Sequence, residues 1–409
     1  MTVKLAIFHP AFETIGGAEI LAATQASVLR DEGFHPEVIT QGFNSANWAA
    51  RLEGIPVHLV PKRHWTDLLA GWDRMRKLRR RGKRAAAALR SYDVVIAHNW
   101  PASAILGEAN IRARKIWQCN EPPRGLHLRE ANPVLMARVV ASSGWGQDAA
   151  TREFQGALIA HDRSLSRASS LRARLAFDLE GCRHLDLIYA ISEFSRDNAR
   201  RIYGQCREEV IYPIVRFPEG VPHRSGLDRA VRKVLVHSRL EVLKNIDTVI
   251  RGFQRFAAAS PVPCHLHVVG EGPSRPLLEA LAGELCTPGT VKFHGYLPDG
   301  ELQEVYAACD VFALVTLDEP FGMVYPEAAA RGLLLVGPDH GGPLEILDGG
   351  RLGWAVDAFS PEALAQALEA IWALDDAEVD RRRAVADQAC RSRFGKAAIV
   401  PQLKALLEG

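Results

Sequence analysis

The sequence predicts an α/β fold that contains two doubly wound halves. Apolar runs such as residues 93–97 and 311–316 lack alternating polar positions, which is typical of strands buried on both faces of a parallel sheet. Polar turns that contain glycine follow several of these runs and lead into helical segments, as in strand–turn–helix units. A segment rich in proline, glycine and charge, residues 213–228, divides the chain and is interpreted as a linker between domains.

Length and composition are those of a globular enzyme. The 409 residues correspond to about two or three domains of roughly 150 residues each. With 47% hydrophobic residues, 24% charged residues and a formal net charge of +2, the chain gives no reason to expect a nucleic-acid partner. No apolar run reaches the ~20 residues that a membrane span needs, and the chain begins directly with a strand pattern, so no secretory signal is expected.

Cysteine usage indicates a reducing compartment. The chain has seven cysteines, an odd number, and no CxxC pair. This pattern argues against a disulfide framework and against a zinc site. We therefore expect a cytoplasmic protein.

The first half begins with a strand at residues 3–8 and a helix at 18–30. Between them lie Gly16 and Gly17, and two glycines at such a turn allow the backbone to approach a ligand closely. A tight turn without a ligand would explain the same pattern. Short strands are expected next, at residues 37–40 and 57–60.

A basic run follows, and two interpretations of it stay open. Residues 74–84 contain eight arginines and lysines and lead into the apolar stretch 85–89. Such a run is commonly the solvated face of a helix. The alternative is a patch that meets anionic lipid or an anionic acceptor, and because few large apolar residues accompany the charges, it would support only peripheral membrane contact.

The strand at 93–97 ends on His98. A histidine at the carboxyl end of a strand faces the crevice in which α/β sheets bind ligands, although a core histidine with a satisfied ring is an alternative. Strands expected at 116–120, 187–191 and 210–212 complete the first sheet.

The region from about residue 126 to 184 matches no pattern that we can place. It is rich in arginine, alanine and serine, with basic positions at Arg163, Arg167, Arg172 and Arg174. The residues themselves do not assign this region a role.

The second half opens with a strand at 233–237. Arg239 and Lys244 follow it, and two cations five positions apart between a strand and a helix suit a diphosphate group; ordinary surface charge is the alternative. Strands are expected at 265–269 and 291–293, and the loop after the latter contains Tyr296 and Leu297. Helices are expected at three places near the end of the chain, residues 361–374, 378–393 and 396–407.

The stretch from 311 to 346 carries most of the chemistry. A strand at 311–316 is followed by an acidic turn, a helix that starts at Tyr325, a strand at 333–336 and a glycine-rich turn at 337–342. Proline in the first turn of that helix is tolerated because the missing N–H would have no partner there. This arrangement is half of a nucleotide-binding sheet.

The turn before this helix offers both donors and acceptors. The free N–H groups of Gly322, Met323 and Val324 favour a phosphate. Glu319 and Glu327, eight positions apart, would repel a phosphate and are better suited to accepting hydrogen bonds from hydroxyl groups. The combination suits a sugar nucleotide, whereas a capping glutamate and a solvated glutamate are the simpler interpretation.

The wider sequence resembles the retaining glycosyltransferases of family 4 (group 1), which have the GT-B fold. The resemblance rests on the EPFG…PEAAARG frame with its GGPLEI turn, on SRLEVLKNID, on DVVIAHN and on the GGAE turn. It is strong over residues 233–346 and weak over 124–184. It implies a Rossmann-like acceptor-side domain at residues 1–215 and a Rossmann-like domain that binds the nucleotide sugar at 229–393, with a cleft between them. Acceptor specificity would lie in the region 126–184 of the first domain. A helix at 394–409 would cross back to the first domain.

The resemblance also implies roles for single residues. Glu319 and His98 would lie against the donor sugar, and Glu327 would bind the ribose. Arg239 and Lys244 would bind the diphosphate, with the turn at Gly322, Met323 and Val324. Tyr296 and Leu297 would cradle the base, and Gly16 and Gly17 would lie on the donor side of the first domain.

The implied reaction moves a hexosyl group from a UDP- or GDP-linked sugar to a hydroxyl of a glycan, a glycolipid or a small molecule. The configuration would be retained by the front-face route, in which the leaving phosphate takes the acceptor proton, since no second carboxylate is placed as a nucleophile. No DxD pair lies in a suitable loop, so we expect neither a metal nor a cofactor. Peripheral contact with the inner face of the membrane is a further expectation.

Other protein classes fit less well. A nicotinamide-dependent dehydrogenase would need GxGxxG directly after the first strand, and residues 10–19 lack that pattern. An epimerase of the same fold, or a non-catalytic regulator that binds a sugar nucleotide, would keep every donor-binding residue. The sequence leaves both as alternatives.

Overall fold

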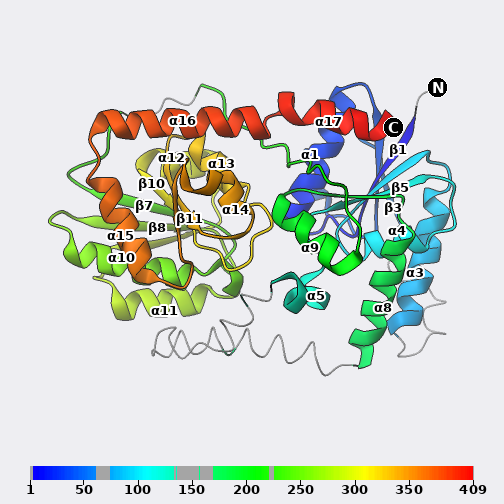
Figure 1. The fold of residues 1–409 in the computed structure, drawn as a ribbon, viewed down its shortest axis with the longest axis horizontal. Helices are drawn as coiled ribbons and strands as arrows, with labels where there is room; N and C mark the ends of the chain where they lie inside the picture. The colour runs from blue at the N-terminus through cyan, green and yellow to red at the C-terminus, as the bar shows by residue number, and fades with distance from the viewer. Residues whose placement is uncertain are drawn as a thin grey trace. The chain divides into compact units, whose positions relative to one another are not determined.

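A computed structural model of the chain describes residues 3–60, 74–132, 169–220 and 225–408, with the isolated positions 135 and 156. These residues form two compact units (Figure 1). The described part of the first unit falls within Met1–Pro133, Asp162–Ile214 and Lys396–Gly409, and that of the second within Val134–His161 and Val215–Gly395.

The first unit contains a six-stranded parallel sheet in the order β3-β2-β1-β4-β5-β6. This is the doubly wound order, in which the chain starts in the middle of the sheet and winds outward in both directions. The strands are β1 (Lys4–His9), β2 (His35–Thr40), β3 (Val57–Leu59), β4 (Val94–His98), β5 (Arg114–Cys119) and β6 (Leu187–Ala190).

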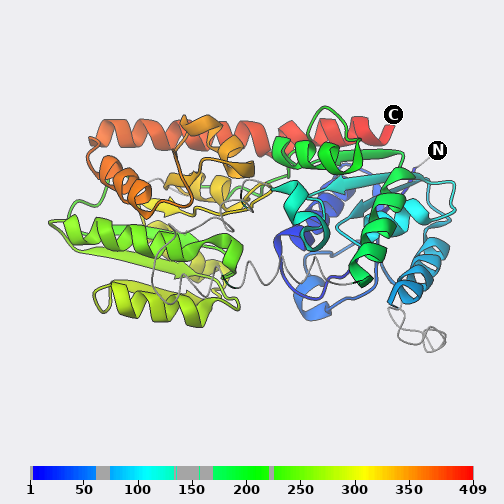
Figure 2. The same ribbon diagram turned by 60° about the horizontal axis from the view of Figure 1, so that its bottom comes forward.

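Helices cover both faces of this sheet (Figure 2). They are α1 (Gly17–Asp31), α2 (Ser45–Trp48), α3 (Arg74–Leu89), α4 (Ala102–Glu108), α5 (Arg124–Ala131), α8 (Ser169–Arg183), α9 (Glu193–Tyr203) and α17 (Lys396–Glu408). One core cluster contains residues of α1 and α17, and the other contains residues of α3, α4, α8 and α9. Because both faces are covered, strands such as β4 are buried at every position.

The carboxyl-terminal helix α17 is part of the first unit. Its Ile399, Leu403 and Leu406 are buried in the core cluster that includes α1. Charged contacts join the same two elements, since Lys404 Nζ lies 2.6 Å from Glu32 Oε2, directly after α1. Apolar burial supplies most of the stabilisation, at about 25 cal/mol per Å² of apolar area.

The second unit repeats the doubly wound plan with the strand order β12-β11-β10-β7-β8-β9, again all parallel. The strands are β7 (Arg232–His237), β8 (Cys264–Val269), β9 (Val291–Gly295), β10 (Val311–Ala313), β11 (Leu334–Pro338) and β12 (Trp354–Val356). The helices are η2 (Val242–Lys244), α10 (Ile246–Ala259), α11 (Arg275–Leu285), α12 (Asp299–Ala308), α13 (Val324–Ala329), α14 (Gly341–Ile346), η3 (Asp348–Gly350), α15 (Pro361–Trp372) and α16 (Asp376–Phe394).

Local sequence explains where the late helices begin. Ser360 Oγ accepts a hydrogen bond of 3.0 Å from Ala363 N at the start of α15, with Pro361 in the first turn. Asp375 caps α16 in the same way, accepting from Glu378 N at 2.8 Å. Capping residues of this kind contribute ~1 kcal/mol each.

Two predicted strands differ from the structure. The strand expected at residues 210–212 is wrong: Ile211 N donates to Ala190 O at 3.0 Å, but Pro213 has no N–H with which to continue a ladder. The strand expected at 311–316 ends earlier, at Ala313, because the chain leaves the sheet and Leu317 N bonds to Leu243 O instead. The basic run forms the helix α3, while Arg163 and Arg167 lie outside the described residues.

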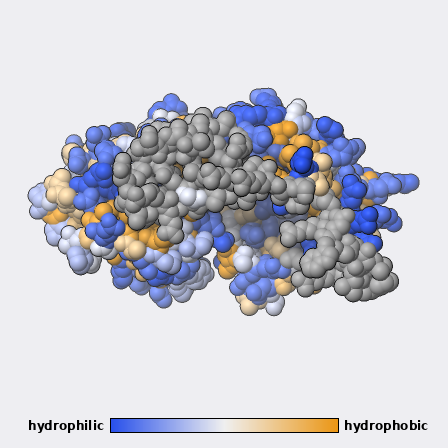
Figure 3. Space-filling model, turned by 90° about the horizontal axis from the view of Figure 1, so that it is seen from below, coloured by the Kyte–Doolittle hydropathy of each residue, from blue (hydrophilic) through white to orange (hydrophobic). Residues whose placement is uncertain are grey.

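All seven cysteines of the chain are free thiols. Among the described helices, none combines the length and the apolar character that crossing a membrane requires. On the face seen in Figure 3 most of the described surface is hydrophilic, and hydrophobic residues occupy separate patches.

Candidate functional site

Each sheet has one topological switch point, where neighbouring strands continue in opposite directions across the sheet. In the first unit this point lies between β1 and β4, and in the second between β7 and β10. Ligands of open α/β sheets bind outside the carboxyl ends of the strands at such points. His98 ends β4, Arg239 and Lys244 follow β7, and Glu319 follows β10.

An ion pair spans the switch point of the second unit. Lys244, at the end of η2 after β7, donates from Nζ to Oε2 of Glu319, which follows β10, over 2.5 Å. The two side chains are 20% and 14% exposed, so the pair is only partly hydrated. A phosphate that binds Lys244 must compete with Glu319, and Glu319 then becomes free to accept from a hydroxyl group.

Asn245 holds Lys244 in place. Its buried side chain donates from Nδ2 to Val315 O and to Ala358 O, both at 2.7 Å, and its Oδ1 accepts from Thr248 Oγ1 at 2.9 Å. The residue has a φ of 55°, in the left-handed region where asparagine is better tolerated than most residues. This one amide therefore ties the start of α10 to the segment after β10.

Arg239 differs from Lys244 in its surroundings. Its guanidinium is 61% exposed and pairs with Glu241 through Nε at 2.7 Å. An exposed ion pair of this kind is worth at most ~1 kcal/mol, so Arg239 can exchange this partner for a ligand at little cost.

The turn after Glu319 packs against the glycine-rich turn after β11. Gly342 N donates to Glu319 O at 2.9 Å, and a Cβ at Gly342 would lie only 2.2 Å from Pro320 O. Gly322 has a φ of 94°, and a Cβ there would lie 2.8 Å from the ring of Tyr325. These close approaches explain two of the glycines and fix the backbone that leads into α13.

Helix α13 begins at Val324, one residue before the predicted start, and follows Gly322 and Met323. The first N–H groups of a helix have no partner within it. The buried Tyr325 holds this turn in place, because its hydroxyl group donates a hydrogen bond to Leu314 O. The three residues predicted to face a phosphate thus follow Glu319 closely in sequence, on the segment that joins β10 to α13.

Glu327, in the first turn of α13, is a partly buried carboxylate without a hydrogen bond or ion pair from any described side chain. Burial raises its pKa from 4.5 to about 7, an effect that Arg331 opposes and Asp299 reinforces. Arg331 donates to the main-chain oxygen of Glu327 at 2.8 Å rather than to its carboxylate. A desolvated carboxylate with no donor is costly to keep, which is consistent with a place for a ligand's hydroxyl groups.

Tyr296 and Leu297 follow β9, next to close-packed loops. A Cβ at Gly270 would lie 1.9 Å from Ser238 O, and Gly270 N donates to Gly295 O at 2.8 Å. These contacts fasten together the loops after β7, β8 and β9. Tyr296 directly follows these packed residues, and 66% of its surface is exposed. Its ring is therefore accessible for stacking against another aromatic group.

In the first unit, His98 ends β4 and is completely buried. Its Nε2 lies 2.8 Å from Gln25 Oε1, and its Nδ1 has no partner among the described residues. Burial lowers the pKa of His98 to about 3, with a smaller contribution from His9. The predicted contact between His98 and a sugar would have to be made through Nδ1.

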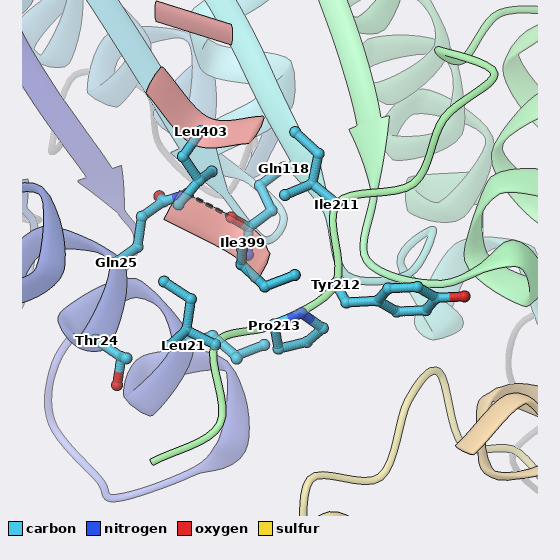
Figure 4. A pocket seen from close by; sticks show the side chains of 10 residues that line it. Leu21, Thr24, Gln25, Gln118, Ile211, Tyr212, Pro213, Ile399 and Leu403 are labelled. Atoms are coloured by element: carbon cyan, nitrogen blue, oxygen red, sulfur yellow. Dashed lines mark hydrogen bonds between the residues drawn. The ribbon is translucent and has the colours of Figure 1, made fainter. Parts of the chain in front are cut away.

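The neighbours of Gln25 define the proton position on His98. Gln25 Nε2 donates to Gln118 Oε1 and to Tyr189 OH, each at 2.8 Å, so its Oε1 is the acceptor. A neutral His98 must therefore carry its proton on Nε2, leaving the Nδ1 lone pair free to accept. Figure 4 shows Gln25 and Gln118 pointing toward each other beside Leu403.

The polar network continues along the carboxyl ends of the strands. Gln118 Nε2 donates to Asn120 Oδ1 at 3.1 Å, and Asn120 Nδ2 donates to Asn99 Oδ1 at 3.0 Å. Asn99 in turn lies 3.5 Å from Nε2 of His9, whose pKa burial lowers to about 4. The adjoining cavity in Figure 4 has a volume of about 20 Å³, enough for about one water molecule and too small for a sugar.

Gly16 and Gly17 lie where the sequence predicts, between β1 and α1. Gly16 is the N-cap of the helix, and a Cβ there would lie 2.6 Å from Glu19 Oε2. The positive end of the α1 dipole lies at this turn, where the carboxylate of Glu19 already occupies the first turn of the helix.

The residues whose hydrogen bonds hold the predicted site residues in place were not identified from the sequence. Gln25 lies in the buried stretch 21–29 of α1, and His9 and Gln118 lie at or near the ends of buried strands. A polar side chain in a buried stretch is the available signal, because burial of such a group requires hydrogen bonds. In the described residues, no group of three or more His, Cys, Asp and Glu side chains is placed to hold a metal ion.

Comparisons with known proteins agree with this arrangement. The family model described as "Glycosyl transferases group 1" matches residues 222–389, and the model "Glycosyltransferase Family 4" matches residues 15–216. Anabaena HepE in complex with UDP and glucose superposes with a TM-score of 0.72 at 18% identity, covering 100% of both chains. WaaG, a glycosyltransferase involved in lipopolysaccharide biosynthesis, superposes with a TM-score of 0.63 at 15% identity, covering 95% of both chains.

Curated relatives match only part of the chain. Mannosylfructose-phosphate synthase of Agrobacterium fabrum is 29% identical over 259 residues, 59% of this chain and 56% of that protein. D-inositol 3-phosphate glycosyltransferase of Corynebacterium urealyticum is 36% identical over 171 residues, 40% of each chain. The chain thus spans about half or less of the length of these relatives.

Proposed function

This chain belongs to the group 1, family 4 glycosyltransferases and has the GT-B fold, and from this premise we propose that it is a retaining hexosyltransferase. The donor would be a UDP- or GDP-linked sugar, and the acceptor would be a hydroxyl group of a glycan, a glycolipid or a small molecule. Membership of this family supports glycosyl transfer as the activity. The residues at the two switch points support the proposed donor and mechanism.

Glu327 is the observation that carries the proposal. It is a partly buried carboxylate with a raised pKa and no side-chain partner among the described residues. The two hydroxyl groups of a ribose would donate hydrogen bonds to its oxygens and offset the cost of desolvating the carboxylate. Lys244 and Glu319, at the switch point of the same sheet, then fit the diphosphate and the sugar of one nucleotide sugar.

The leaving diphosphate gains negative charge in the transition state. Lys244, Arg239 and the N–H groups at Gly322, Met323 and Val324 would stabilise that charge. Removal of one such preorganised donor commonly costs ~3–4 kcal/mol in the activation barrier. Two cations and a helix start would thereby fill the role that a metal has in other transferases, which makes the proposed reaction metal-independent.

The sugar gains positive charge as the diphosphate departs. Once Lys244 turns to the phosphate, Glu319 would hold the sugar by its hydroxyl groups. Retention would follow from the front-face route, in which the leaving phosphate oxygen takes the proton of the acceptor hydroxyl as the new glycosidic bond forms on the same face. The contact between the sugar and Nδ1 of His98 stays a prediction.

A panel of UDP-, GDP- and ADP-linked sugars tests the proposal. Slow hydrolysis of one donor without acceptor is expected, with the released sugar first appearing in the anomeric configuration of the donor, as followed by proton NMR. Conversion of the nucleotide sugar into its epimer would identify an epimerase instead. Tight binding of a donor with no turnover, even with sugar, lipid and glycan acceptors present, would identify a non-catalytic binding protein.

A further inference from the structure

A second cavity lies in the first unit, away from the switch point of that unit. It has a volume of about 380 Å³ and is formed by α3, α4 and α8, which pack side by side (Figure 1). Small-molecule sites commonly have volumes of roughly 300–1,000 Å³. The cavity is therefore large enough for a ligand of the size of a phosphorylated sugar.

The cavity lies toward the amino ends of the strands of this sheet, whereas His98 lies at the carboxyl ends. Its lining residue Arg90 precedes β4, and its lining residues Glu108 and Asn110 precede β5. In a parallel sheet all amino ends lie at one edge, whereas His98 and Asn120 lie at the carboxyl ends. The cavity and the switch point are therefore separate sites.

One stripe of α3 forms a wall of the cavity. Arg79, Gly82, Lys83 and Ala86 recur at helical spacing, and Arg90 follows at the helix end in the same register. Arg79, Lys83 and Arg90 are exposed and have no hydrogen bond or ion pair with any described residue. Three cations without partners at one cavity favour an anionic group, and arginine in particular binds phosphate through two parallel hydrogen bonds.

Gly82 keeps the cavity open. Glycine is a poor helix former, yet here a Cβ would lie 3.7 Å from Ile105, an ordinary contact. By contrast, a Cβ at Gly107 would lie 1.7 Å from the carbonyl oxygen of Gly181, so those two glycines are required where α4 crosses α8. Helix packing therefore explains Gly107 and Gly181 but leaves Gly82 unexplained, whereas an open cavity explains it.

The remaining lining residues narrow the class of ligand. Ile105 and Phe177 are buried and form an apolar floor that suits the C–H face of a ring. Glu108 is exposed, has no partner among the described residues and would repel a phosphate, but its carboxylate can accept from hydroxyl groups. Asn110 can both donate and accept.

We propose that this cavity binds a sugar or polyol phosphate, with the phosphate on Arg79, Lys83 and Arg90 and the hydroxyl groups on Glu108 and Asn110. The same chemistry occurs in a free sugar phosphate and in the headgroup of a phosphoinositide lipid. The site lies beyond the proposed transferase reaction and requires no nucleotide sugar.

Calorimetry with glucose 6-phosphate, glucose and inorganic phosphate tests the site in the 409-residue chain without nucleotide. Glucose 6-phosphate is expected to bind most tightly, and Lys83→Ser should weaken it about tenfold or more. Gly82→Leu, which fills the cavity, should abolish binding. Lys77→Ser is the matched control, because Lys77 carries the same charge on the same helix but does not line the cavity.

A second arm distinguishes the source of the ligand. Phosphatidylcholine vesicles with and without phosphatidylinositol are sedimented with the same variants. Capture that requires phosphatidylinositol and is lost in Gly82→Leu would support the site with a lipid headgroup as its ligand. Absence of binding in both arms, equal effects of Lys77→Ser and Lys83→Ser, or equally tight binding of inorganic phosphate would overturn the proposal.

Discussion

Replacement of Glu327 by glutamine should weaken nucleotide binding. The variant keeps the shape of the side chain but removes the charge that would accept from the ribose hydroxyl groups. A hydrogen bond to a charged group contributes roughly 1.5–3 kcal/mol, so affinity for the cognate nucleoside diphosphate should fall by about one to two orders of magnitude. Calorimetry with free UDP and GDP measures this, and an unchanged affinity would refute the ribose role.

The same substitution should stabilise the protein, and the pH dependence follows from the raised pKa. The pKa of Glu327 is about 7 in the folded state against 4.5 ordinarily. Below pH 4.5 both states hold the proton and ionisation has no cost. Between these values the unfolded state loses its proton first, so the folded state is progressively penalised, and above pH 7 the full penalty of ~3 kcal/mol is present.

Glu327→Gln should therefore raise the melting temperature more at pH 8 than at pH 5. The difference of ~2–3 kcal/mol corresponds to about 5–10 °C for a domain of this size. Any cost of burying the amide is the same at both pH values and cancels in the comparison. An equal shift at the two pH values would refute the inference that Glu327 is held ionised at a cost.

Further predictions concern the diphosphate site and its support. Lys244→Ala should reduce kcat by more than it raises KM, and by more than Arg239→Ala does, because Arg239 is 61% exposed and Lys244 only 20%; an increase in KM alone would make either residue a docking contact. Asn245→Gly keeps the permitted φ but leaves two buried carbonyls without a donor, so chemical denaturation should show a loss of ~2–5 kcal/mol. Activity should survive EDTA, and a complete loss that a divalent ion restores would contradict metal independence.

The fold was predictable because its signals are local. Runs such as 94–97 are apolar at every position and predict buried parallel strands, and the glycines at 16–17 and 341–342 mark the turns that follow β1 and β11. The failed strand at 210–212 has the same apolar character, but Pro213 directly after it cannot extend a ladder. Composition alone does not show whether such a segment finds a neighbouring strand.

The contacts within the site were not predictable, because they depend on which strands become neighbours. Lys244 and Glu319 are 75 positions apart, and they meet only because β7 and β10 lie side by side at the switch point. Gln25 and Gln118 are 93 positions apart and reach each other from a helix and a strand. A sequence pattern assigns each residue to an element, whereas the partner of each side chain follows from the order of the strands.

The two switch points share a backbone plan but differ in electrostatics, and this difference divides the proposed work between them. His98 and His9 have lowered pKa values and are joined by amides, so the polar network of the first unit is neutral at physiological pH. The second unit instead contains the charged pair of Lys244 and Glu319, and also Glu327, whose carboxylate has no hydrogen bond or ion pair from any described side chain. Charged side chains can stabilise a departing diphosphate. A neutral network with a fixed tautomer has fixed hydrogen-bond donors and acceptors, so it can select hydroxyl groups by their positions without attracting other ions. We therefore propose that the second unit stabilises the leaving group and binds ribose and sugar hydroxyl groups through Glu327 and Glu319, whereas the first unit offers hydroxyl groups fixed neutral partners.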